Sequence, residues 1–260
     1  MEQDKQRSEA LDAAAQAGKL LLESGAEIAR VEETMARICT HYGVREESFY
    51  VLSNGIFLTD EDGEGRCYAR TEHIPIHQTR LDRVAAVNQL SREIERGEHG
   101  LEEAREILDR IASMPEKGKL WQVLAAGVGS AAFCVLFGGS GRDALSALAA
   151  GLGLQLYMVT LGGRLSKVTG TLTGSVLVTA IGCFMQWIGV GEHLNFTIIG
   201  SIMPLIPGVA FTVAIRDTAN GDYISGFVRM LDALLGFFCI AVGVAFALFV
   251  YHSITGGVLL

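Results

Sequence analysis

Five long apolar stretches fill the second half of the chain and restrict it to a membrane-spanning fold. They cover residues 120–137, 144–163, 168–190, 194–215 and 230–251. About 20 helical residues, each rising ~1.5 Å, cross a hydrocarbon core about 30 Å thick, and each stretch is close to that length. A soluble core is not expected to contain five such helices in a row without a charged face. We therefore predict five transmembrane helices, forming a membrane domain over residues 118–260.

The charged residues divide the chain near Pro115. Residues 1–117 carry 15 Lys/Arg and 24 Asp/Glu, and residues 118–260 carry 6 and 5, which sum to the totals of 21 and 29. This break predicts a separate N-terminal domain over residues 1–115. The first apolar segment is amphipathic rather than a secretory signal, so we expect this domain in the cytosol. Its acidic balance argues against nucleic acid as a partner.

The pattern of the N-terminal domain predicts an α+β fold. Apolar residues recur at three- and four-residue steps in segments that we expect to be helices, at residues 8–24, 26–43, 81–96 and 101–113. Between them, residues 48–74 form a β section, with turns expected at Ser53-Asn54-Gly55 and at residues 62–65. The expected fold class is thus an α-helical membrane bundle of five transmembrane helices preceded by a cytosolic α+β domain.

The sequence contains no motif that indicates an enzyme or a cofactor. It has neither a P-loop nor a Gly-x-Ser-x-Gly nucleophile motif. His73 and His77 stand near acidic residues, but their spacing matches no strong metal-ligand pattern, and exposed histidines explain it equally well. The five cysteines are scattered and are typical of packing residues. We therefore predict no catalytic site, no metal and no cofactor.

Basic residues between the apolar stretches predict the orientation. One side has six of them and the other has Arg142 alone, and the positive-inside rule places the richer side in the cytosol. The N-terminus is then cytosolic and the C-terminus extracytoplasmic, in a multi-pass protein of the plasma (inner) membrane. The six residues are Lys117, Lys119, Arg164, Lys167, Arg216 and Arg229.

The fourth apolar stretch contains two prolines near its middle. Pro204 and Pro207 each remove a backbone donor, and Gly208 follows directly. The helix is therefore either kinked or broken at membrane depth. A break is tolerated there only where protein or a water-filled cavity satisfies the backbone, as in many transporters. Both interpretations remain open from the residues alone, and Thr212 lies in the same stretch.

Two further groups of polar residues lie at the ends of apolar stretches. Thr169 and Thr173 share one helical face, where their hydroxyls either bind a polar group of a substrate or bond back to the helix carbonyls. Arg216 and Asp217 follow the proline-containing stretch. They are either a gate, substrate clamp or proton site, or a loop pair that anchors the helix end.

Four segments together resemble the threonine/serine exporter family. Residues 21–32 (LLESGAEIARVE) resemble its N-terminal signature, and residues 79–90 (TRLDRVAAVNQL) its later soluble helix. Residues 204–217 (PLIPGVAFTVAIRD) and 221–229 (GDYISGFVR) resemble its membrane core. The similarity covers nearly the whole chain.

This resemblance implies secondary export of a small carboxylate-bearing metabolite. Long members of the family carry a second five-helix domain, and this chain ends at Leu260 without it. It therefore resembles the split members, some of which are associated with succinate export. The expected partner is a separate five-span membrane subunit or another copy of the chain.

The substrate is an amino acid of the threonine/serine type or, alternatively, a dicarboxylate. A membrane-anchored enzyme or sensor is the alternative from another class. The residues that we place in the substrate pathway are Thr169, Thr173, Pro204, Pro207, Gly208, Thr212, Arg216 and Asp217.

Overall fold

The computed structural model describes residues 2–44, 49–61, 67–74 and 79–255. It contains two compact units. The first unit comprises Met1–Pro115 and Val209–Leu231, and the second comprises Glu116–Gly208 and Asp232–Leu260. The N-terminal part of the chain and a short segment from near its other end thus share one unit.

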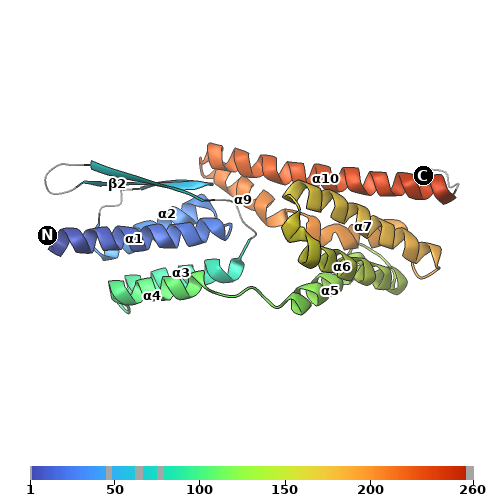
Figure 1. The fold of residues 1–260 in the computed structure, drawn as a ribbon, viewed down its shortest axis with the longest axis horizontal. Coiled ribbons are helices and arrows are strands. Elements are labelled where there is room, and N and C mark those ends of the chain that lie inside the picture. Colours follow the sequence, from blue (N-terminus) through green and yellow to red (C-terminus); the bar gives the residue numbers. More distant parts are fainter. Residues whose placement is uncertain (1, 45–48, 62–66, 75–78, 256–260) are drawn as a thin grey trace. The chain divides into compact units, whose positions relative to one another are not determined.

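The first unit is built on four helices of the N-terminal region, α1 (Glu2–Glu23), α2 (Ile28–His41), α3 (Leu81–Glu95) and α4 (Leu101–Ala112). Helices α1 and α2 lie between the strands on one side and α3 and α4 on the other (Figure 1). Each helix turns an apolar stripe toward this interior, as the three- and four-residue spacing predicts. The core includes Leu21, Met35, Ile38, Ile56, Leu90 and Leu108.

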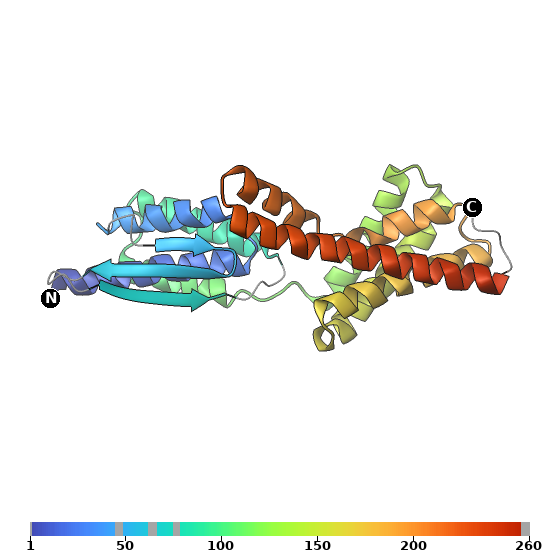
Figure 2. The same cartoon turned by 90° about the horizontal axis from the view of Figure 1, so that it is seen from above.

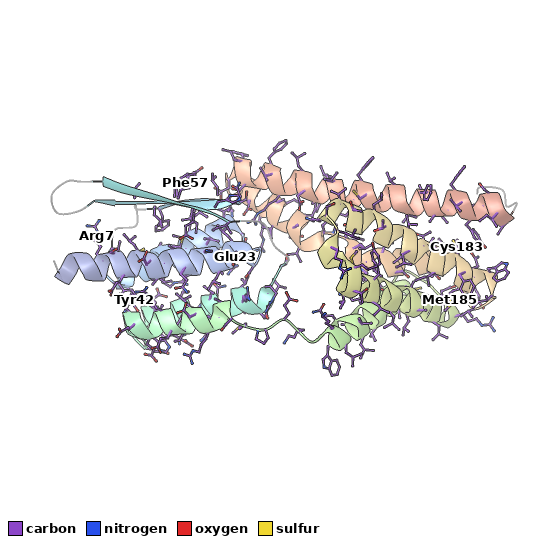
Figure 3. The ribbon with its side chains drawn as sticks, in the orientation of Figure 1. Arg7, Glu23, Tyr42, Phe57, Cys183 and Met185 are labelled. Atoms are coloured by element: carbon purple, nitrogen blue, oxygen red, sulfur yellow. The ribbon has the colours of Figure 1, made fainter. Side chains whose placement is uncertain are left out.

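Three antiparallel strands, β1 (Phe49–Leu52), β2 (Gly55–Glu61) and β3 (Cys67–His73), form a sheet of order β1-β2-β3 (Figure 2). Leu52 pairs with Gly55, so the first hairpin turn is Ser53-Asn54. Side chains alternate between the two faces of a strand. The pair Val51 and Ile56 is buried, whereas Tyr50 and Phe57 remain exposed on the other face (Figure 3). The turn expected at residues 62–65, like His77, lies outside the described residues.

The second unit is a helical bundle with the length and composition of membrane spans. It contains α5 (Lys119–Leu136), α6 (Gly141–Leu161), α7 (Lys167–Trp187), α8 (Leu194–Ile202) and the larger part of α10 (Tyr223–Thr255). Among the described residues, four helices are long and apolar enough to cross a membrane, and a bent helix pair is a fifth candidate. The chain is therefore a mostly helical, multi-helix membrane protein with a small sheet.

Large apolar side chains remain exposed on the outside of this unit, as lipid-facing residues do. Trp121 near the start of α5 and Trp187 at the end of α7 are 72% and 71% exposed. Tryptophan is enriched where helices leave the hydrocarbon, because its ring is amphipathic. Phe238, Phe246 and Phe249 on α10 are exposed in the same way.

Inside the bundle, small residues allow close helix contact. A Cβ atom added to Gly200 on α8 would lie 2.7 Å from both the Cys134 nitrogen and the Ser130 oxygen of α5. Lipid provides no hydrophobic drive for helices to associate, so such backbone contact supplies the packing energy instead.

The segment from α9 (Gly208–Ala219) into α10 lies in a different unit from the one expected from the sequence. Residues 209–231 were expected in the membrane domain but lie within the first unit. Helix α10 also begins at Tyr223, seven residues before the apolar stretch that starts at residue 230, and it runs for 33 residues. At ~1.5 Å per residue it is about 50 Å long, more than a hydrocarbon core requires.

Candidate functional site

The proline-containing stretch is a broken helix. Helix α8 ends at Ile202, a short 3-10 helix, η3 (Met203–Leu205), follows, and α9 begins at Gly208. The two helical parts are bent by 62° at the break. Proline lacks an N–H and its ring clashes with the preceding turn, so Pro204 and Pro207 explain why the α-helix stops here. The sequence had left a kink and a break open, and the structure has the break.

The break packs against other helices of the second unit, among them α7 and α10. Leu205 of η3 lies near Gly174 of α7, where an added Cβ would be 3.5 Å from the Leu205 Cδ2 atom. Pro207 lies against Gly236 of α10, where an added Cβ would be 3.2 Å from the Pro207 Cγ atom. The irregular backbone is therefore held by protein, which is the condition for tolerating it at membrane depth.

The hydroxyls of Thr169 and Thr173 are engaged within the second unit. Thr173 Oγ1 donates to the Thr169 carbonyl at 2.7 Å and lies 2.6 Å from the Tyr157 hydroxyl on α6. Thr169 Oγ1 lies 2.9 Å from Ser166 Oγ, and Ser166 also caps α7. Back-bonding of Thr173 to the helix carbonyl is thus present. Thr173 adjoins Gly174, so the structure brings it near the break.

The remaining predicted residues fall on both sides of the unit boundary. Pro204 and Gly208 are exposed in the second unit. Thr212, Arg216 and Asp217 belong to the first unit; Thr212 and Arg216 are exposed, and Asp217 is fully buried.

A cluster of charges in the first unit joins the α1–α2 turn to α9. Glu27 Oε1 accepts hydrogen bonds from Arg30 Nη2 and from Arg216 Nη1, each at 2.9 Å. Burial acts to raise the pKa of Glu27. The hydrogen bond from Arg30 and the positive charges of Arg216 and Arg30 outweigh that effect, so its pKa lies below the usual value. Glu27 is therefore a stable anion between two guanidinium groups.

Asp217 forms the buried centre of the same cluster. Its Oδ1 atom accepts the backbone N–H of Ile28 at 3.0 Å, and its Oδ2 atom lies 3.3 Å from Arg229 Nη1. Arg229, on α10, also donates to the Ala26 carbonyl at 2.8 Å. Carboxylate and guanidinium are almost fully enclosed, with side chains 0% and 9% exposed. A buried ion pair of this kind depends on such additional hydrogen bonds.

One further hydrogen bond and one electrostatic interaction extend the cluster. The Ser225 hydroxyl on α10 accepts the backbone N–H of Ser53, in the turn between β1 and β2, at 3.0 Å. Burial and the negative charge of Asp222 raise the pKa of Glu32 on α2.

Sequence reasoning selected Arg216 and Asp217 but not their partners. Glu27 and Arg30 stood within the resembling N-terminal segment without an assigned role, and Arg229 was counted for orientation and lay in the resembling segment 221–229, also without a role in the site. The sequence signal that could have identified these partners was the scarcity of charged residues after residue 117, because each ionisable residue among apolar helices requires a partner.

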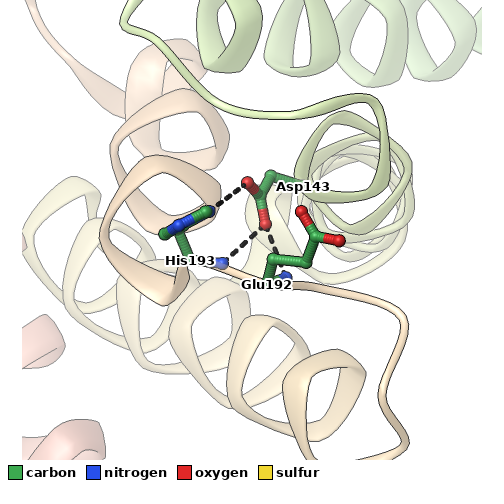
Figure 4. Close-up of side chains that lie close together, drawn as sticks. All are labelled: Asp143, Glu192 and His193. Carbon is green, nitrogen blue, oxygen red and sulfur yellow. Dashed lines mark hydrogen bonds and ion pairs between the residues drawn. The ribbon is translucent and has the colours of Figure 1, made fainter.

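A third polar group, Asp143, Glu192 and His193 in the second unit, has the ligand types of a metal site (Figure 4). One ligand atom from each lies within 4.8 Å of the others. However, both Asp143 oxygens already accept N–H groups: Oδ1 accepts those of Glu192 and His193 at 2.7 Å, and Oδ2 that of Ser140 at 2.9 Å. A cation would approach against these positive dipoles. The arrangement instead caps α6 and fixes the loop that precedes α8.

Comparisons with known proteins match nearly the whole chain. A family model described as "Putative threonine/serine exporter" matches residues 12–251. Two curated bacterial relatives carry the name "Probable succinate transporter subunit YjjP". The one from Escherichia coli is 26% identical over 91% of this chain and 92% of its own length. The one from Klebsiella aerogenes is 26% identical over 88% of each chain.

A fungal relative is longer. An uncharacterized protein of Schizosaccharomyces pombe is 28% identical over 69% of this chain, which corresponds to 21% of its own length. No solved structure matches the chain.

Proposed function

The chain belongs to the threonine/serine exporter family, and from that premise we propose that it is a subunit of a secondary exporter. It moves small carboxylate metabolites of the threonine/serine type out of the cell by alternating access. The family and the bacterial relatives carry transporter names, so the chain is a membrane transport protein rather than an enzyme.

The observation that carries the proposal is the broken helix at Pro204 and Pro207 within a bundle of apolar helices. Discontinuous helices in transporters expose backbone N–H and C=O groups at membrane depth, where these groups bind substrates and coupling ions. The N-terminus of α9, at Gly208, presents the positive end of a helix dipole, which favours a carboxylate. An added Cβ at Gly208 would meet nothing within 4 Å, so there is open space beside this end of α9, although the Gly208 N–H itself donates to the Ile206 carbonyl.

Hydroxyls extend this proposed pathway. Thr173 and Thr169 lie on the helix that packs against the break, and Thr212 lies one turn along α9. The buried side-chain atoms without a hydrogen-bond partner among the described residues include two hydroxyls of this bundle, Ser130 Oγ and Thr197 Oγ1. Buried hydroxyls of this kind are uncommon in a finished core, and they support a bundle that rearranges during transport.

A dicarboxylate is the alternative substrate, because the bacterial relatives are named as succinate transporter subunits. Both substrate classes carry the carboxylate that the α9 terminus would bind. The word "subunit" in those names also supports a partner, which we propose to be a separate five-span membrane protein or a second copy of this chain. We place the protein in the plasma membrane as a five-span chain, with its N-terminus in the cytosol and its C-terminus outside.

Reconstitution tests the function directly. The full chain is placed in proteoliposomes alone and with a candidate five-span partner protein, and efflux of labelled threonine, serine and succinate is measured. We expect partner-dependent efflux of at least one of them. Absence of efflux of all three in both preparations would overturn the proposal. A C-terminal reporter enzyme in cells should read as extracytoplasmic, and a cytosolic reading would contradict the five-span arrangement.

A further inference from the structure

Helix α2 begins without a cap from its own neighbourhood. Glu27 occupies the N-cap position, but its side chain makes no capping hydrogen bond and is directed to arginines instead. The first turn of α2 also contains no acidic residue. The first N–H groups of a helix have no partner within the helix, and the positive end of its dipole favours a nearby anion.

Asp217 supplies the missing cap from 189 positions further along the chain. Its Oδ1 atom accepts the N–H of Ile28, the first residue of α2, and its negative charge lies at the positive end of the dipole. Arg229 donates to the Ala26 carbonyl and forms an ion pair with the other carboxylate oxygen, at 3.3 Å but without a hydrogen bond, so the α1–α2 turn is bound by both α9 and α10. These contacts all lie within the first unit.

This arrangement couples the position of α9 to the integrity of α2. Asp217 lies on the helix that begins immediately after the break at Pro207. The hydrogen bond is 3.0 Å long, and such bonds are effectively lost beyond about 3.5 Å. A shift of α9 by ~1 Å away from α2 would therefore leave the buried N–H of Ile28 unpaired.

We propose that Asp217 is a positioning residue for transport: as the cap of α2, it holds α9, and with it the C-terminal side of the helix break, in a position set by the N-terminal domain. This inference rests on the proposed exporter function. It gives the N-terminal domain a role in the transport cycle, because α9 moves freely only when the cap is released.

A matched pair of full-chain variants tests the cap itself. Arg229→Met combined with Asp217→Asn removes both buried charges but keeps an oxygen that accepts the Ile28 N–H. Arg229→Met combined with Asp217→Ala removes the charges and the acceptor. Asparagine caps helices about as well as aspartate, whereas alanine does not. Because neither variant leaves a lone buried charge, both avoid the largest risk to folding.

Hydrogen exchange of the first-turn amides of α2 is measured in detergent or nanodiscs. Loss of a cap weakens a helix end by an amount that corresponds to roughly 2- to 30-fold in an opening equilibrium. We expect exchange about tenfold faster in the alanine variant than in the asparagine variant. Equal exchange in the two would overturn the cap. Asp232→Asn, which removes the exposed ion pair with Lys167 in the second unit, is the control and should leave α2 unchanged.

Efflux then separates positioning from simple stabilisation. At equal amounts of inserted protein, we expect the efflux rates of the alanine and asparagine variants to differ by at least about fivefold, in either direction, with an unchanged KM. Equal efflux combined with altered exchange would show that the cap serves the fold alone and would overturn the positioning role. If the wild-type chain exports nothing, the exporter proposal and the positioning role both fail, while the exchange result still decides the cap.

Discussion

Two arginines in the charged cluster should respond very differently to the same substitution. Arg229 is enclosed, with a side chain 9% exposed, and it is 3.3 Å from the fully buried carboxylate of Asp217. Arg216 is 62% exposed and contacts Glu27, which keeps a second hydrogen bond, to Arg30, at 2.9 Å. Replacement of each by glutamine removes one positive charge, but only the Arg229 change leaves a buried charge without a counter-ion.

The magnitudes follow from burial. Removing one partner of a buried pair costs about 3–5 kcal/mol, because the remaining charge cannot be solvated. An exposed pair contributes about 0–1 kcal/mol. For domains of 150–250 residues, 1 kcal/mol shifts the melting temperature by roughly 2–4 °C. We therefore expect Arg229→Gln to lower the melting temperature by about 6–20 °C, and Arg216→Gln by less than about 4 °C.

Cys39 provides a local assay, because its side chain is buried in the first unit. A thiol reagent modifies it only when that unit opens, so the temperature of half-maximal labelling in the solubilised full chain reports the transition. The other cysteines are distinguished by peptide mass spectrometry. Equal shifts for the two variants, or a shift below about 2 °C for Arg229→Gln, would refute the assignment of a buried ion pair.

Three further substitutions give separate tests. Gly200→Ala should destabilise the bundle by about 1–3 kcal/mol, because the new methyl meets backbone atoms of α5. In the control variant Gly129→Ala the methyl meets nothing within 4 Å, so this change should be neutral or stabilising in the same melting assay. Pro207→Ala should lower efflux at unchanged membrane insertion, since insertion follows total apolarity; normal efflux would remove the break from the transport site. Burial and the negative charge of Asp222 raise the pKa of Glu32 in the folded protein above its value in the unfolded chain. Ionisation of Glu32 therefore lowers the free energy of unfolding as the pH rises through these two pKa values. Glu32→Gln should therefore raise the melting temperature at pH 7 but not at pH 4, and an equal effect at both values would contradict this.

Much of the fold follows from local patterns. The apolar stretches and the amphipathic spacing depend on residues within a few positions of one another, and the helices α5 to α7 begin and end close to the expected residues. The hairpin was expected at Ser53-Asn54-Gly55, and the structure has it there with Ser53-Asn54 as its central residues, one position before the Asn-Gly pair. Pro204 and Pro207 interrupt the helix through the covalent geometry of proline, but that geometry allows either a kink or a break, and only the structure showed the break.

The candidate site could be predicted only in part, because its contacts join residues that are far apart in the sequence. Side chains such as those of Thr173 and Arg216 were identifiable as polar groups among apolar helices, but their partners were not. Tyr157 approaches Thr173 only after α6 packs on α7. The capping pattern of Asp143 likewise depends on a loop about 50 positions away.

The sequence by itself determined that this chain is a multi-helix membrane protein of the exporter family with one helix interrupted by two prolines, because hydropathy, charge distribution and proline geometry are properties of the chain. Only the tertiary structure decided that residues 209–231 belong with the N-terminal helices. It also decided that Asp217 caps α2, a contact across 189 positions. Such a contact exists because a buried carboxylate requires donors, and packing of distant segments, not local spacing, determines which donors are within reach.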